Sequence, residues 1–143
     1  HSDSDGCGGY KGLYSSGENT PRLDLCTSGR TPIAERLILH ELGHAWVHHN
    51  LTDSQRQAFV TLQDLPAWTG ATLDWGDRGS EQAAEILAWG LQETSRPPRS
   101  IPNNDPESLT TAFHQLTGTN PIYRHEQLMA TRPTNPHQQR RPP

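Results

Sequence analysis

The order of hydrophobic and polar residues predicts two short strands near the N-terminus. One candidate covers residues 10–14, and the other covers residues 22–26, where Leu23 and Leu25 alternate with polar neighbours. Such alternation is typical of a strand that buries one face. Residues 15–19, Ser-Ser-Gly-Glu-Asn, supply turn formers between the two candidates. We therefore expect a β-hairpin here.

Beyond residue 30 the hydrophobic residues recur at intervals of three and four, which predicts a helix. Thr31 as N-cap and Pro32 in the first turn form a start signal for this helix. We expect the helix to end near Asn50. Its hydrophobic positions include Ile33, Leu37, Ile38, Leu42 and Ala45.

Start and stop signals predict three further helices. The first opens with a capping-box sequence at residues 52–55 and runs through Leu62. The second is expected over residues 81–94, with Ser80 as its N-cap. The third covers residues 105–118, from Asp-Pro-Glu to a terminal glycine.

The four tryptophans are interpreted mainly as core residues. Trp46 and Trp89 lie on predicted helices, where we expect both to be buried. Trp68 and Trp75 lie on the loop over residues 65–79, and we favour core anchoring over substrate contact for both.

Together these elements predict one α+β domain over residues 10–125, with a small N-terminal sheet followed by a helical bundle. Residues 1–9 are polar and Gly-rich, and we expect them to be mobile. Residues 126–143 are rich in Pro, Gln and Arg, and we expect them to be disordered. Because only 31% of the chain is hydrophobic, the core must be modest.

Cys7 and Cys26 are the two cysteines of the chain. A disulfide between them would close a loop of about 20 residues and contribute roughly 3 kcal/mol in the chain-entropy model. Such a bond requires an oxidising compartment, so we expect a secreted or cell-envelope protein. Because the first residue is His and not Met, we expect the sequence to be either a processed form or a fragment. Two unpaired thiols in a cytosolic protein are the alternative.

Charge and hydropathy exclude two classes of partner. A formal net charge of −4 and a pI near 6.0 give no electrostatic basis for binding nucleic acid. No apolar run approaches the roughly 18–20 residues that span a bilayer. We therefore expect a soluble protein without a membrane span, and we expect it to be a monomer.

The segment His40-Glu41-Leu42-Gly43-His44 lies within the first predicted helix and forms the pattern His-Glu-x-x-His. Residues four apart share a helix face, so His40 and His44 can present nitrogens to one metal ion. Glu41 lies beside the pair, where it can take a proton from an activated water molecule. Gly43 leaves room on the helix surface. A pair of surface histidines on an ordinary helix is the alternative.

A catalytic zinc site takes three protein ligands and keeps another position open, so a third ligand is needed. The extended metzincin pattern requires Gly and His where this chain has Val47 and Asn50. Asp74 is one candidate for the third ligand, because it lies in a partial match to a Gly-Thr-x-Asp segment that supplies an aspartate ligand. Glu81 and Glu85, four apart on one later helix, fit best.

The pairing of His40-Glu41-x-x-His44 with Glu81-x-x-x-Glu85 resembles the gluzincin branch of the zincin metallopeptidases, especially its small bacterial members. The resemblance covers roughly residues 31–92. It implies that His40, His44 and Glu81 bind zinc and that Glu41 is the general base. It also implies that Glu85 orients a ligand histidine.

The resemblance further implies a zinc-dependent peptidase acting on peptide or protein substrates. An extended edge strand, assigned to residues 23–26, would lie beside the active-site helix and pair with the peptide. Tyr123, His114 and Arg78 are candidates to stabilise the oxyanion, and no spacing selects among them. A non-catalytic zinc-binding interaction module and a hydrolase of cell-wall peptides are the alternatives.

Overall fold

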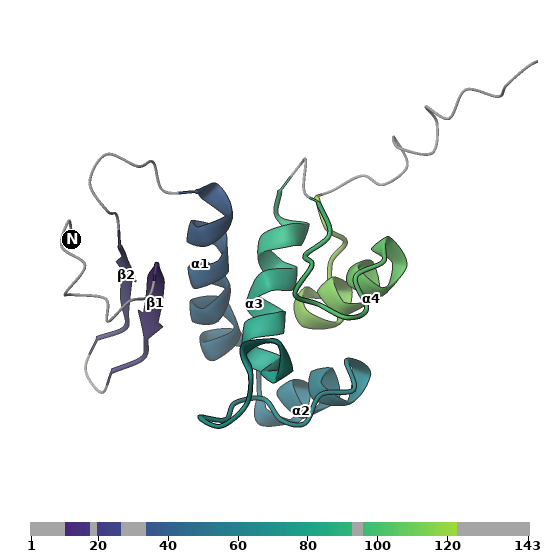
Figure 1. The fold of residues 1–143 in the computed structure, drawn as a ribbon, viewed down its shortest axis with the longest axis horizontal. Helices are drawn as coiled ribbons and strands as arrows, with labels where there is room; N and C mark the ends of the chain where they lie inside the picture. The colour runs from purple at the N-terminus through teal and green to yellow at the C-terminus, as the bar shows by residue number, and fades with distance from the viewer. Residues whose placement is uncertain (1–10, 18–19, 27–33, 93–95, 123–143) are drawn as a thin grey trace, which may run out of the picture.

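The computed structural model describes residues 11–17, 20–26, 34–92 and 96–122. Within them, two strands are followed by four α-helices and one short 3-10 helix (Figure 1). The expected α+β class, with a small antiparallel sheet before the helices, is confirmed. The expected mobile residues 1–9 and disordered residues 126–143 lie outside the described ranges.

The strands β1 (Gly12–Ser15) and β2 (Arg22–Leu25) form an antiparallel hairpin. Gly12 is opposite Leu25, and Tyr14 is opposite Leu23. Because side chains alternate along a strand, these four residues share one face of the sheet. Tyr14 contacts α1 from this face, since its hydroxyl lies 3.2 Å from Nε2 of His49. The hairpin therefore packs against the helices with this face.

Helix α1 (Glu35–Asn50) carries the His-Glu-x-x-His segment. The expected start at Thr31 and Pro32 is wrong, because the helix begins at Glu35 with Ala34 as an N-cap that makes no side-chain hydrogen bond. Thr31 and Pro32 lie outside the described residues. In place of a cap, the first turn has a tertiary contact: Nη2 of Arg36 lies 2.6 Å from Oε1 of Glu85 on the third helix.

The capping signals of two other helices are confirmed. Helix α2 (Asp53–Leu62) starts with a capping box in which the backbone of Thr52 donates to Oε1 of Gln55 at 2.9 Å. Helix α4 (Pro106–Thr117) has Asp105 as N-cap, and Gly118 ends it in the left-handed conformation with φ of 72°. Residues within one turn of α2 and α4 therefore determine where these capped ends lie.

Helix α3 (Gly79–Gly90) differs from its expected bounds at both ends. Its N-cap is Arg78, whereas Ser80 lies inside the helix. The first backbone N–H groups are satisfied by the preceding loop, because Gly79 and Ser80 donate to the carbonyls of Ala67 and Trp68 at 3.0 and 2.9 Å. At the other end, the carbonyl of Gly90 accepts from the backbone of Ile122 at 2.7 Å. Distant backbone segments therefore set both ends of α3.

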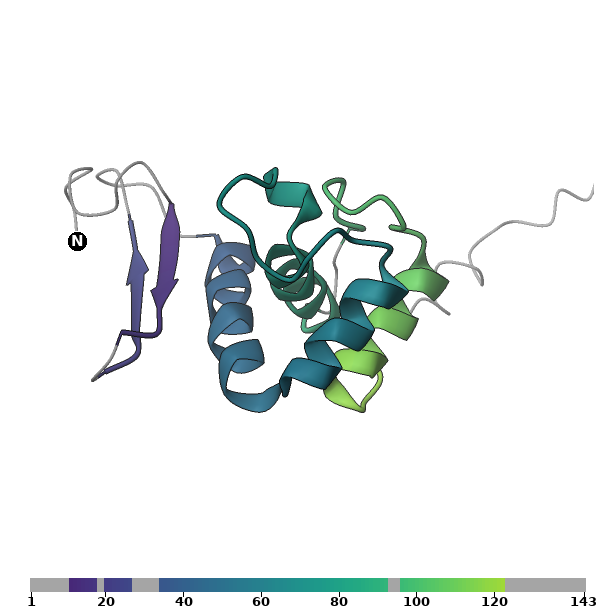
Figure 2. The same cartoon turned by 90° about the horizontal axis from the view of Figure 1, so that it is seen from below.

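Helix α3 is the centre of the molecule, between α1 on one side and α4 on the other (Figures 1 and 2). It is buried nearly all round, as expected for a helix surrounded by others. Trp89 on this helix is only 1% exposed, as expected, and Trp68 packs against the core, as expected. Trp46 packs against the same core but is only partly buried. The main core residues are Val47, Leu51, Phe59, Ile86, Leu87, Trp89, Ile101, Leu109, Phe113 and Leu116.

The hairpin lies on the face of α1 that is turned away from α3, with β1 nearer the helix than β2 (Figure 1). We expected residues 23–26 beside the active-site helix, and this assignment is wrong: β1 takes that place. Gly12 is the reason, because its lack of a side chain allows the backbone of β1 to approach Glu41 closely. No helix in the described part of the chain has the length and apolar character needed to cross a membrane.

Candidate metal centre

His40 and His44 lie one turn apart on α1, on the side of the helix that faces α3. Their Nε2 atoms are 3.1 Å apart, and the two rings meet edge to face. Both side chains are mostly covered, with 12% and 17% of their surface exposed. The helix therefore presents two imidazole nitrogens to one point, as the spacing of four residues predicts.

Glu81, in the first turn of α3, supplies a carboxylate oxygen at the same point. Its Oε2 atom is 3.3 Å from Nε2 of His40 and 3.2 Å from Nε2 of His44. The three atoms form an almost equilateral triangle. This group could hold a metal ion.

The triangle depends on a close approach of α1 to α3 at Gly43. A Cβ atom at this position would lie 2.9 Å from the Cα and 3.0 Å from the carbonyl oxygen of Ala84. Both of those atoms belong to backbone, so neither can rotate away. Gly43 therefore allows the helices to meet at the level where His40 and His44 face Glu81.

Glu85, one turn after Glu81 on α3, contacts the other nitrogen of His40. Nδ1 of His40 donates to Oε2 of Glu85 at 3.1 Å, which leaves Nε2 of the same ring free to act as a ligand. Oε1 of Glu85 accepts from Nη2 and Nε of Arg36 at 2.6 and 3.1 Å. This is the position expected for a residue that orients a ligand histidine.

Arg36 is a site residue that the sequence reasoning missed. It lies four residues before His40, so the two side chains share a face of α1. Its guanidinium holds the Glu85 carboxylate that in turn holds His40. The spacing of four residues between Arg36 and His40 could therefore have indicated that Arg36 belongs to the site.

The contacts at the triangle shift the pKa values of His40 and Glu81. Burial alone would lower the pKa of His40, but hydrogen bonds to Glu81 and Glu85 and their negative charges outweigh it and raise the pKa to about 9. Burial would raise the pKa of Glu81, yet hydrogen bonds to His40 and His44 hold it at about 2. Without a metal ion, a charged imidazole therefore faces a charged carboxylate.

Glu41 lies beside this group and under the hairpin. The residue is only 5% exposed. Burial raises the pKa of its carboxyl above the ordinary 4.5, against the positive charges of His40 and His44 and a hydrogen bond from the backbone of Tyr14, which lower it. A buried carboxylate with a raised pKa is a suitable proton acceptor.

Trp75 contradicts its expected place in the core. It lies on the 3-10 helix η2 (Trp75–Asp77) and is 40% exposed. Its indole ring stacks on the imidazole of His40, with ring centroids 5.9 Å apart and planes 23° from parallel. Trp75 therefore lies beside the candidate metal centre and not in the core.

The remaining candidates lie elsewhere. Asp74 is exposed and lies outside the three-residue group. Arg78 donates to the carbonyl of Leu73 at 2.7 and 3.0 Å, so its guanidinium holds the loop. His114 is exposed on α4. Tyr123 lies outside the described residues.

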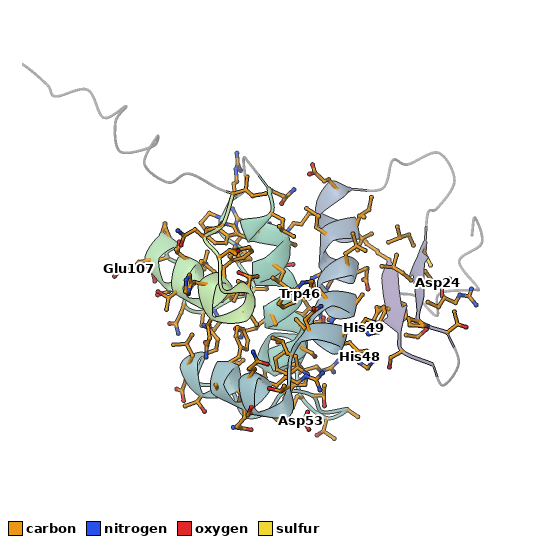
Figure 3. The ribbon with its side chains drawn as sticks, turned by 180° about the vertical axis from the view of Figure 1, so that it is seen from behind. Asp24, Trp46, His48, His49, Asp53 and Glu107 are labelled. Atoms are coloured by element: carbon orange, nitrogen blue, oxygen red, sulfur yellow. The ribbon has the colours of Figure 1, made fainter. Side chains whose placement is uncertain are left out.

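His48 and His49, at the end of α1, are exposed and lie beside Tyr14 of the hairpin (Figure 3). Cys7 lies outside the described residues, so the Cys7–Cys26 disulfide stays a prediction.

No protein-family model, curated protein or solved structure matches this chain. Within the described ranges, His40, His44 and Glu81 are the only group of His, Cys, Asp or Glu side chains placed to share an ion. The function is therefore inferred from the geometry of this group.

Proposed function

We propose that this protein is a zinc-dependent peptidase of the zincin type, in which His40, His44 and Glu81 hold the ion and Glu41 is the general base. The supporting observation is the size of the ligand triangle. In a tetrahedral site, two ligand atoms are about 1.6 times as far apart as each is from the metal. Zinc bonds of about 2.0–2.1 Å therefore need ligand atoms about 3.3–3.4 Å apart.

The measured edges of the triangle are 3.1, 3.3 and 3.2 Å, close to that requirement. Calcium, with bonds of about 2.3–2.6 Å, prefers all-oxygen sites with more ligands. Magnesium likewise prefers oxygen ligands and retains several waters. Two imidazole nitrogens and one carboxylate oxygen are a typical donor set for catalytic zinc, so size and chemistry agree.

A bound zinc ion would supply positive charge that polarises a substrate carbonyl and makes a water molecule more acidic. The chain's own residues supply the rest. Within the described residues no fourth side chain joins His40, His44 and Glu81, and each of these three side chains is 12% to 19% exposed. Arg36 and Glu85 hold the His40 ring in the orientation that directs Nε2 to the triangle.

Glu41 would move the proton. The positive charges of His40 and His44 lower the pKa of its carboxyl against the effect of burial, which supports a place close to the ligand triangle. In a peptidase, this carboxylate accepts a proton from the attacking water and delivers it to the departing amine. The close approach of Gly12 on β1 restricts the orientations open to its side chain.

The variant Glu41→Gln tests this proposal. It should bind zinc as the wild type does, because residue 41 is not a ligand, while hydrolysis of an unfolded polypeptide falls by roughly 100-fold or more. Zinc content by elemental analysis and cleavage with and without a chelator are the measurements. Glu35→Gln, an exposed position in the first turn of the same helix, is the matched control. Full activity of Glu41→Gln rejects the assigned base.

One observation favours a second candidate, a non-catalytic zinc-binding interaction module. Glu41 is covered by β1, and Arg78 is already bonded to the loop carbonyl of Leu73, so neither a free base nor an oxyanion donor is ready in this conformation. Zinc-loaded protein that cleaves nothing across a broad peptide library would favour this module over the peptidase.

A further inference from the structure

Trp75 is an exposed aromatic residue in a well-held turn. The other three tryptophans lie in the core or pack against it, whereas Trp75 is 40% exposed. Its neighbours in the turn are Asp74, Gly76 and Asp77, which offer no apolar surface to cover the indole. Core packing therefore does not account for a tryptophan at this position.

Two polar side chains hold the turn in place. Gln82, which is fully buried in α3, donates from Nε2 to the carbonyl of Gly76 at 2.6 Å. Arg78 donates from Nη2 to the carbonyl of Leu73 at 2.7 Å. These bonds restrain the backbone on both sides of Trp75, so the indole ring has a defined position.

That position is directly beside the ligand triangle. One face of the indole stacks on His40, whose Nε2 is a corner of the triangle. Stacking alone is not needed to orient His40, because Nδ1 of the ring is already bonded to Glu85. The exposed part of the indole is therefore an apolar surface next to the metal centre with no partner within the described part of the chain to cover it.

We propose that Trp75 forms an apolar subsite beside the metal centre, which binds an aromatic or large apolar side chain of the peptide next to the cleaved bond. This inference rests on the proposed peptidase function. Flat rings pair well with an indole, and such pairs contribute a several-fold to roughly tenfold gain in binding. The exposed carboxylates of Asp74 and Asp77 on either side disfavour an acidic side chain in this subsite.

Two hydroxamates test the subsite without requiring hydrolysis. Both carry the same zinc-binding group, but benzohydroxamate adds a phenyl ring and acetohydroxamate only a methyl group. Calorimetric titration of the zinc-loaded full chain should give several-fold to about tenfold tighter binding of benzohydroxamate. This preference should shrink to about twofold or less in Trp75→Ala, with the affinity for acetohydroxamate nearly unchanged.

Leu62→Ala is the matched control, because Leu62 is similarly exposed (43%) at the far end of α2. It should keep the wild-type preference. If wild-type protein binds both hydroxamates equally well, or if Trp75→Ala keeps the full preference, the subsite is wrong while the metal centre stands. If neither hydroxamate binds wild-type protein, the proposed function and the subsite fail together. The comparison of the two hydroxamates on wild-type protein still tests the subsite if Trp75→Ala fails to fold.

Discussion

Gly12 of β1 lies directly against the side chain of Glu41 on α1. A Cβ atom at position 12 would be 2.6 Å from Cγ and 2.7 Å from Cδ of that glutamate, closer than nonbonded atoms approach. The backbone of the next residue but one, Tyr14, hydrogen-bonds the same side chain. The hairpin therefore determines where the proposed general base lies.

Substituting Gly12→Ala should move Glu41 or lift β1 away from α1. We expect peptide hydrolysis to fall at least about tenfold, because small displacements of a catalytic group are costly. Zinc affinity should stay within about twofold, since His40, His44 and Glu81 do not touch Gly12. Gly17→Ala is the control in the same hairpin, because a Cβ there would meet only the carbonyl of Thr20 at 3.9 Å. Equal activity of both variants would contradict this role.

Replacing Glu85 with Gln should weaken zinc binding without removing a ligand. Glu85 holds Nδ1 of His40, and loss of such a contact typically lowers metal affinity about 10–100-fold. Glu81→Gln removes a ligand atom and should lower the affinity further. Competition with a chromophoric chelator measures both. Glu107→Gln, on the far side of the molecule from the hairpin, is the control (Figure 3). The reverse order of the two effects would make Glu85 the ligand.

The stability of the metal-free protein should depend on pH in a defined window. The pKa of His40 rises from 6.5 to about 9, so its contribution is complete below pH 6.5 and is lost as the pH rises through about 9. The pKa of Glu81 falls from 4.5 to about 2, so its contribution is present above pH 4.5 and is lost as the pH falls through about 2.

These two groups therefore favour the folded state most between pH 4.5 and 6.5. Thermal unfolding of chelator-treated protein across the pH range checks this. Glu81→Gln should flatten the acidic side of the profile, and it should reduce the loss on the alkaline side because His40 keeps only Glu85 as an acidic partner. A wild-type midpoint that keeps rising beyond pH 9 would contradict the coupling.

Gly43→Ala should separate α1 from α3. Its Cβ would collide with backbone atoms of Ala84, and overpacking of this kind costs about 1–3 kcal/mol, partly offset by the higher helix propensity of alanine. The proposed zinc ligands lie on both helices, so zinc affinity should fall together with the free energy of unfolding. Denaturant unfolding and chelator competition measure the two effects. Gly76→Ala, where a Cβ would lie 3.5 Å from the carbonyl oxygen of Ser100, is the control.

Short-range signals in the sequence predicted part of this structure well. The cap residues Thr52 and Asp105 act within one turn of their helices, so local sequence is sufficient to identify them. The spacing of His40 and His44 likewise follows from helix geometry alone. Glu81 could be selected because a second glutamate, Glu85, follows it one turn later on the same predicted helix.

The errors concern contacts between distant segments. Both ends of α3 are set by backbone from residues 67–68 and from Ile122, which no local pattern reveals. An aromatic residue in a loop gives the same hydrophobic signal whether it faces the core, as Trp68 does, or the imidazole of His40, as Trp75 does. The strand that lies next to α1 depends on how Gly12 fits Glu41, a relation between residues far apart in the chain.

The attachment of the hairpin to a single helix has a consequence for inactivation by heat. β1 and β2 make their extensive contacts with α1, while the four helices share a core of their own. Elements with few buried contacts open at lower free energy than the global transition. On gentle warming, turnover should therefore decline while the helical circular dichroism signal and the bound zinc persist, and cooling should restore turnover at once.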